Sequence, residues 1–96
     1  MKKGYILVRI IIEDHDLFKE YPILSGPIME KFGGKYLVRG GKFKIKEGDW
    51  PADRTTIIEF DSFEKAQKCY ESVEYKKAME IRNKSTKSEL ILIEGY

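Results

Sequence analysis

The side chain best suited to chemistry in this sequence is Arg39, which ends an alternating run bracketed by Gly33-Gly34 and Gly40-Gly41. A guanidinium presents a planar fork that matches a carboxylate or an enolate. Glu59, in a later apolar run, could act as a base, and His15, the only histidine, could carry a proton near neutral pH. We therefore take Arg39, Glu59 and His15 as candidate catalytic residues.

Tyrosine hydroxyls can orient an oxygen-bearing ligand, and a large aromatic ring is seldom left in water without a packing partner. The candidate ligand-binding residues are Tyr21, Trp50, Tyr70, Tyr75 and Arg82. We expect Trp50 to lie at a subunit interface or at the rim of a pocket. A second interpretation pairs Arg39 with Glu59, or with a partner subunit, in a purely structural role. In either case we expect Arg39 to be mostly buried, with Glu59, Glu47 or a bound anion as its acceptor.

The sequence argues against several kinds of site. One histidine is too few for a histidine metal site or a nucleophilic triad within one chain, so we expect no metal and no cofactor. The glycine pairs lack the spacing of a phosphate-binding loop. The formal net charge of +2 is too balanced for a nucleic-acid footprint, and the alternating Lys42, Lys44 and Lys46 fit the solvated face of a strand.

Composition favours one small domain, residues 1–96, in the cytoplasm. The single Cys69 excludes an internal disulfide and fits a reducing compartment, and its helical spacing from Ala66 places it in a core. The apolar run 5–12 is interrupted by Arg9 and is too short to span a bilayer, so we expect no membrane partner.

The periodicity of apolar residues predicts a sheet with helices on one side. Strands are expected at 5–12, 35–46, 55–60 and 90–93, with helices between the first two strands and between the last two. The order strand, helix, strand, strand, helix, strand predicts an α+β, ferredoxin-like split βαβ sandwich, a four-stranded antiparallel sheet with its helices on one face.

Capping and helix-breaking residues mark the helix ends. Asp14 or Asp16, Asp61-Ser62 and Ser72 can cap helix starts, and Gly33 can end a helix in a left-handed conformation. Pro22 and Pro27 predict two separate pieces, 16–21 and 27–32, rather than one straight helix.

Within the second strand, alternation places Tyr36 and Val38 on one face and Leu37 and Arg39 on the other. Gly40-Gly41 then predicts a bulge or a close backbone approach.

The first strand is apolar on both faces, whereas the helices of a two-layer domain cover only one. Packing the two uncovered faces of two copies together would bury this surface. We therefore predict a homodimer that forms an α/β barrel.

Several short motifs resemble the bacterial family called domain of unknown function 1330 over nearly the whole chain. They are Gly4-Tyr5, Phe32-Gly33-Gly34, Arg39-Gly40-Gly41, Glu47-Gly48-Asp49-Trp50, Ile58-Glu59-Phe60, Ala66 with Tyr70, Ser72 with Glu74-Tyr75, Arg82, and Glu94-Gly95. The resemblance implies membership of the dimeric α/β barrels, with a pocket between sheet and helices in each subunit. That superfamily includes cofactor-free oxygenases, isomerases, haem enzymes and ligand-sensing domains.

Two hypotheses for function follow. The first is a cofactor-independent enzyme, of oxygenase or isomerase type, acting on a small carbonyl or aromatic metabolite; Arg39 would hold an anionic group while Glu59 or His15 moves a proton. The alternative is a non-catalytic binding or stress-related accessory domain whose pocket only holds a ligand. A pocket on which Arg39 and tyrosines converge favours the first, and a filled barrel with paired side chains favours the second.

Overall fold

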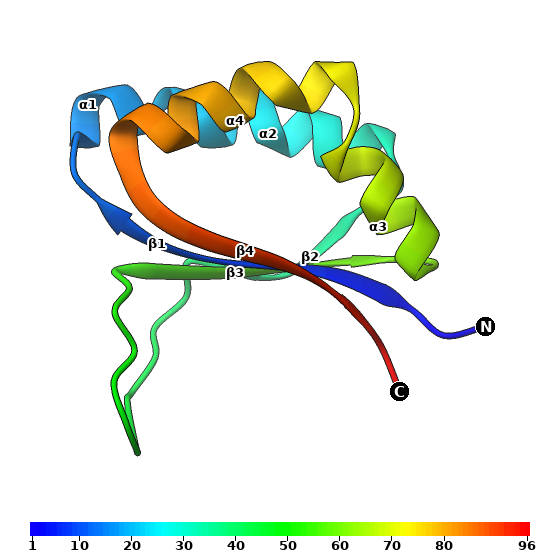
Figure 1. The fold of residues 1–96 in the computed structure, drawn as a ribbon, viewed down its shortest axis with the longest axis horizontal. Coiled ribbons are helices and arrows are strands. Elements are labelled where there is room, and N and C mark those ends of the chain that lie inside the picture. Colours follow the sequence, from blue (N-terminus) through cyan, green and yellow to red (C-terminus); the bar gives the residue numbers. More distant parts are fainter.

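The computed structural model describes all 96 residues and contains four strands and four helices. In chain order they are β1 (Gly4–Ile12), α1 (His15–Phe18), α2 (Glu20–Lys31), β2 (Lys35–Arg39), β3 (Arg54–Phe60), α3 (Phe63–Tyr70), α4 (Val73–Ser85) and β4 (Thr86–Glu94). The strands form one antiparallel sheet in the order β2-β3-β1-β4. All the helices lie on one face of this sheet (Figure 1). The predicted ferredoxin-like α+β fold is confirmed.

The core lies between this sheet and the helices. The even-numbered residues of β1 point toward the helices and are almost fully buried, since Ile6, Val8 and Ile10 are 0%, 3% and 1% exposed. Ile58 and Phe60 of β3 share that face. Burying one such side chain stabilises the fold by roughly 1.5–3 kcal/mol. The helices contribute Met29, Ala66, Cys69, Tyr75 and Ala78.

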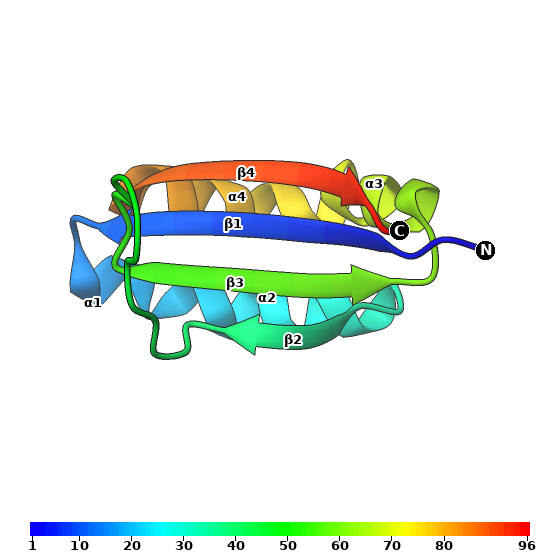
Figure 2. The same cartoon turned by 90° about the horizontal axis from the view of Figure 1, so that it is seen from below.

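The opposite face of the sheet, here called the open face, has no helix over it (Figure 2). The strand register places on it Tyr5, Leu7, Arg9, Ile57, Glu59, Ile91 and Ile93. Ile91 and Ile93 are 51% and 47% exposed, which is high for apolar side chains in a sheet. The open face is therefore an apolar surface without a cover in the single chain.

The helix starts follow the predicted caps. Asp14 Oδ1 accepts a hydrogen bond from the Leu17 amide at 3.0 Å, and the hydroxyls of Ser62 and Ser72 cap α3 and α4 in the same way. Gly33, with φ of +83°, follows the end of α2 as expected.

The predicted break between Pro22 and Pro27 is wrong, because α2 runs through both prolines. Pro22 sits in the first turn, where an amide hydrogen has no acceptor within the helix. Pro27 does remove the donor that would meet the Ile23 carbonyl. Ile23 and Pro27 are both exposed on α2, so solvent can satisfy that carbonyl.

The second strand also differs from the prediction. It ends at Arg39, and a bulge shifts its register between Tyr36 and Val38 rather than at Gly40-Gly41. Tyr36 pairs with Ile58 and Arg39 with Thr56, and both partners face the helices. The extra residue therefore turns Tyr36 and Arg39 to the same face, whereas strict alternation predicts opposite faces.

Residues 40–53, here called the arm, contain no strand, so the predicted continuation over 42–46 is wrong. The arm extends away from the helices, beyond the open face (Figure 1). Its apolar side chains Phe43, Ile45 and Trp50 are 42%, 53% and 38% exposed.

Candidate functional site

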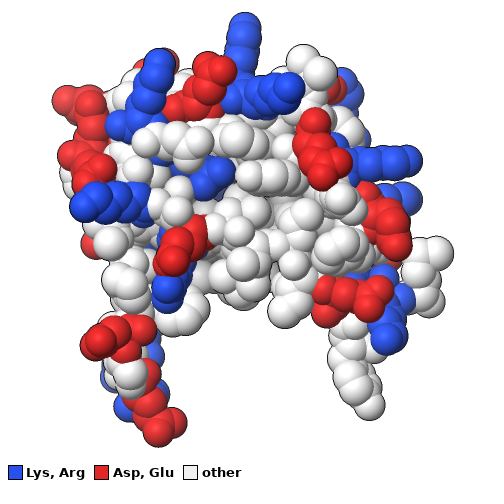
Figure 3. Space-filling model, in the orientation of Figure 1, with Lys and Arg blue, Asp and Glu red and all other residues white.

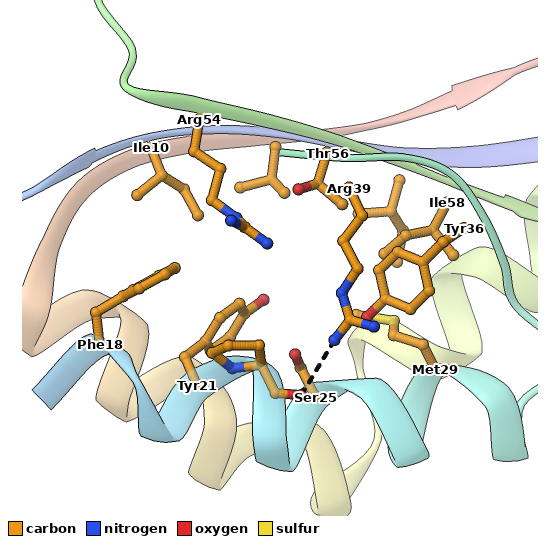
Figure 4. Close-up of a pocket in the computed structure, with 13 residues that line it drawn as sticks. Ile10, Phe18, Tyr21, Ser25, Met29, Tyr36, Arg39, Arg54, Thr56 and Ile58 are labelled. Atoms are coloured by element: carbon orange, nitrogen blue, oxygen red, sulfur yellow. Dashed lines mark hydrogen bonds between the residues drawn. The ribbon is translucent and has the colours of Figure 1, made fainter. Parts of the chain in front are cut away.

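A pocket lies between α2 and the helix-facing side of β1, β2 and β3 (Figure 4). Eight of its 13 lining residues are hydrophobic, and the full set is Ile6, Val8, Ile10, Phe18, Tyr21, Pro22, Ser25, Met29, Tyr36, Arg39, Arg54, Thr56 and Ile58. The cavity volume is about 20 Å³, little more than one water molecule needs. Counting its mouth, which is open to solvent, the space between atoms is about 380 Å³. The closed interior is thus small.

Arg39 reaches across this pocket from β2 toward α2. Its Nη2 donates to the Pro22 carbonyl at 3.3 Å, and its guanidinium carbon lies 4.2 Å from the centre of the Tyr36 ring. The absence of a side chain at Gly26 makes room for it, because a Cβ there would lie 3.1 Å from Nη2. Arg39 is exposed, however, so the prediction that it is mostly buried is wrong. The guanidinium stacks on an aromatic ring at the surface and so keeps its hydration.

Arg54 is a second cation on the pocket, and it is not among the site residues predicted from the sequence. It begins β3, it is half-buried, and its guanidinium carbon lies 5.9 Å from the centre of the Phe18 ring. The guanidinium rests against the backbone of Gly40, where a Cβ would come within 2.5 Å of Nη1. Figure 4 shows Arg39 and Arg54 pointing into the space between sheet and α2 from two adjacent strands.

Neither of these arginines has a carboxylate partner. The six ion pairs of the chain involve other cations, and the one hydrogen bond from Arg39 goes to a neutral carbonyl. A guanidinium stays charged at any ordinary pH. The pocket therefore combines an apolar wall with two uncompensated positive charges.

Tyr21 supplies a buried polar group to the pocket. It is 7% exposed, and its hydroxyl lies 2.5 Å from the hydroxyl of Tyr75, which is fully buried behind it. Arg82, 4% exposed, lies next to this pair, with its guanidinium carbon 6.0 Å from the centre of the Tyr21 ring. Its Nη1 donates to Ser88 Oγ at 2.6 Å, whereas its Nε has no partner. Tyr70 packs on the Tyr75 ring at 5.8 Å and does not line the pocket.

The phenol groups of the site remain protonated. Burial raises the pKa of Tyr21 far above its usual value, and the adjacent Tyr75 adds to that rise. Burial also raises the pKa of Tyr75, while the neighbouring Arg82 guanidinium acts in the opposite direction. The pKa of Tyr36 is raised by burial and lowered in part by Arg39 and by a hydrogen bond with Ser25. All three hydroxyls can therefore act as hydrogen-bond donors at neutral pH.

The sequence profile of the family described as Domain of unknown function (DUF1330) matches residues 3–96. The chain belongs to this family. No curated protein matches it.

Among solved structures, this DUF1330 chain is similar to a protein of unknown function from Rhodopseudomonas palustris, with 21% identity and a TM-score of 0.75 over 96% of this chain and 81% of that one. It is also similar to SnoaB, a cofactor-independent oxygenase from Streptomyces nogalater, with 8% identity and a TM-score of 0.61 over 97% and 92% of the two chains. An ethyl tert-butyl ether d (ethd) family protein from Bacillus halodurans gives 17% identity and a TM-score of 0.53 over 95% and 97%. At these identities the likeness shows the ferredoxin-like α+β fold and nothing finer.

Two of the predicted catalytic residues lie outside the pocket of this DUF1330 domain. Glu59 is on the open face, where it accepts a hydrogen bond from the Tyr5 hydroxyl at 3.1 Å. Because Arg39 is on the other face, the predicted Arg39–Glu59 pair does not form. His15 is exposed at the start of α1 and lines no pocket.

Trp50 is also outside the pocket, on the open face. Its Nε1 donates to Thr55 Oγ1 at 3.0 Å, and the Arg9 guanidinium carbon lies 4.8 Å from the centre of its ring. It lines a shallow depression with Leu7, Arg9, Glu89 and Ile91. Trp50 is therefore positioned to meet whatever covers the open face.

No three histidine, cysteine or acidic side chains come together in a group that could hold a metal ion. None of the four helices has the length and apolar character needed to cross a membrane. The cytoplasmic location stays a prediction.

Proposed function

We propose that this domain binds a small organic anion with an apolar body in the pocket between α2 and the sheet, and that Arg39 and Arg54 hold the anionic group. The observation that carries the proposal is two guanidiniums without carboxylate partners on one apolar pocket. A carboxylate offers each of them the anionic partner that it lacks. The apolar lining favours an organic acid over an inorganic anion.

The size of the pocket sets how the ligand enters. A cavity of about 20 Å³ does not admit an organic acid, so binding requires the pocket to widen at its mouth. Arg39 is exposed and held by one hydrogen bond of 3.3 Å to a neutral carbonyl. A carboxylate can replace that carbonyl as the acceptor, which draws Arg39 off α2 and opens the pocket.

The test is a titration of the ¹⁵N-labelled protein, followed by NMR, with pentanoate and with the uncharged pentanamide. We expect pentanoate to shift the amide signals of pocket residues and pentanamide to bind more weakly. Arg39→Ala and Arg54→Ala should each weaken pentanoate binding by about tenfold, because a hydrogen bond to a charged group is lost. Lys35→Ala is the matched control, since it removes the same charge from β2 outside the pocket lining. Equal binding of acid and amide, or unchanged binding in both arginine variants, contradicts the proposal.

The second candidate function is a cofactor-independent enzyme, and the observation that favours it is again the pair of arginines on the pocket. Arg39 and Arg54 would stabilise an enolate oxygen as well as a carboxylate, and SnoaB is a cofactor-independent oxygenase on a similar fold. With Glu59 and His15 outside the pocket, the pocket residues offer charge stabilisation rather than a base. The test is hydrogen–deuterium exchange at the carbon beside the carbonyl of 2-oxopentanoate. Faster exchange with the wild type than with Arg39→Ala supports this candidate, and equal exchange rates contradict it.

We also propose that two copies pack together through their open faces. Leu7, Ile91 and Ile93 supply the apolar surface, and Trp50 lies beside them. In Figure 3 the edge of the molecule away from the helices is hollowed between the arm and the C-terminal end, and it carries few charges there. A second sheet fits such a surface better than solvent does, because its apolar side chains would leave water.

A further inference from the structure

A chain of polar groups leads from the buried side of α4 to the pocket. It runs from Arg82 through the hydroxyl of Tyr75 to the hydroxyl of Tyr21. Of these three residues, Tyr21 lines the pocket. The proposed binding of an organic anion does not use it, and an arrangement of three buried polar groups is costly unless their hydrogens are placed well. Where each hydrogen points decides what the pocket can bind.

The direction of the hydrogen bond between the two tyrosines follows from their neighbours. Arg82 is a donor only, so it cannot accept the proton of Tyr75. Tyr75 is fully buried, and the Tyr21 oxygen is the one acceptor that its side chain meets. If Tyr21 donated instead, the Tyr75 proton would be left without a partner inside the core. The arrangement that satisfies Tyr75 is therefore the one in which Tyr75 donates to Tyr21.

This direction leaves the proton of Tyr21 free. The Tyr21 hydroxyl meets no acceptor in the protein other than Tyr75. Its ring points from α2 toward the space beneath Arg54 and Thr56, as Figure 4 shows. Tyr21 is 7% exposed, so its remaining proton is a buried donor directed into the pocket. A buried donor of this kind needs an acceptor, and the Tyr21 hydroxyl makes no hydrogen bond to the other residues that line the pocket.

We propose that the ligand carries a second oxygen acceptor besides its anionic group, and that Tyr21 donates to that oxygen. The ligand class is then an oxo acid or a hydroxy acid: the carboxylate meets Arg39 and Arg54 at the mouth, and the carbonyl or hydroxyl oxygen meets Tyr21 inside. This inference rests on the proposed binding of an organic anion and narrows it. Arg82 strengthens the donor, because its positive charge repels the Tyr75 proton toward the Tyr21 oxygen and so polarises the Tyr21 hydroxyl toward the pocket.

The experiment compares three acids of one length by the same NMR titration: pentanoate, 2-oxopentanoate and 4-oxopentanoate. We expect at least one of the oxo acids to bind the wild type about fivefold more tightly than pentanoate, which is the effect of one added hydrogen bond. Tyr21→Phe should remove this preference while the affinity for pentanoate changes by less than about twofold. Tyr70→Phe is the matched control, since Tyr70 loses the same hydroxyl beside Tyr75 but outside the pocket.

Tyr75→Phe tests the direction of the hydrogens. If Tyr75 donates to Tyr21, its loss leaves the Tyr21 proton in place but less polarised, so the preference for the oxo acid falls without vanishing. If Tyr21 instead donates to Tyr75, the same change frees the Tyr21 proton and the preference rises, which overturns the inference.

The comparison of the three acids with the wild-type protein tests the second acceptor even if Tyr21→Phe does not fold. If pentanoate binds through Arg39 and Arg54 and neither oxo acid binds more tightly, the proposed second acceptor is wrong but the proposed anion site is supported. No binding of any of the three acids overturns both.

Discussion

Replacing Gly26 by alanine should stabilise the protein, and the contact with Arg39 sets by how much. Gly26 lies inside α2 with an ordinary φ, and glycine there costs about 1 kcal/mol relative to alanine. Outside the backbone of α2, the three atoms nearest to the new methyl group all belong to the Arg39 guanidinium, with Nη2 at 3.1 Å. That group is the end of a flexible, exposed side chain, so it can move by the few tenths of an ångström required.

The cost of that movement is the hydrogen bond from Arg39 to the Pro22 carbonyl. At 3.3 Å and in contact with solvent, it contributes about 0.5 kcal/mol, at the low end for such bonds. Gly26→Ala should therefore raise the free energy of unfolding by about 0.5 kcal/mol in the wild type and by about 1 kcal/mol in Arg39→Ala, where nothing has to move. For a chain of this size, the wild-type gain corresponds to an increase in Tm of about 2–4 °C.

The assay is urea unfolding of the four proteins of this double-mutant cycle, followed by circular dichroism at one protein concentration, because association would add to apparent stability. Gly34→Ala is the control with the opposite sign. A Cβ at Gly34 would lie 2.8 Å from the Met29 carbonyl oxygen and 2.9 Å from the Phe60 ring, neither of which can move away, so it should destabilise by about 1–3 kcal/mol. A loss of stability from Gly26→Ala in both backgrounds, or an equal gain in both, refutes the proposed contact between Gly26 and Arg39.

The sequence was sufficient for the architecture because the architecture depends on local signals. The even-numbered apolar residues of β1, the capping side chains of Asp14, Ser62 and Ser72, and Gly33 after α2 each act within a few residues of the chain. The predicted helix break at Pro27 was wrong. The cost of proline in a helix depends on whether the freed carbonyl faces solvent, which the sequence does not show.

The site was harder to predict because it depends on pairing between distant segments. The bulge in β2 decides that Arg39 faces the helices, and it exists only in the register against β3. Arg54 resembles an ordinary solvated charge at the start of a strand, and only its pairing with Ile10 puts it on the helix-facing side. Tyr21 and Tyr75 were both candidates, but their contact joins residues 54 positions apart. Arg39 and Tyr21 were therefore predictable as candidate site residues, whereas their grouping with Arg54 was not.

Two further predictions concern Cys69 and the open face. Burial raises the pKa of the Cys69 thiol to about 11, so iodoacetamide at pH 8 should leave the folded protein unlabelled and label it fully in urea. Rapid labelling of the folded protein would contradict the burial of Cys69. The folded chain holds the thiol proton more tightly than the unfolded chain does, so the contribution of Cys69 to stability is complete below about pH 9 and falls as the pH rises toward 11. For the open face, light scattering at micromolar concentration should give about twice the 11.2 kDa chain mass, with Trp50 emission at shorter wavelength than in a monomer. Ile91→Glu places a charge on the apolar surface and should yield monomers. Val73→Glu should not, because Val73 is 77% exposed at the start of α4. A wild-type monomer, or an Ile91→Glu dimer of unchanged stability, would show that the open face is not the surface through which two copies associate.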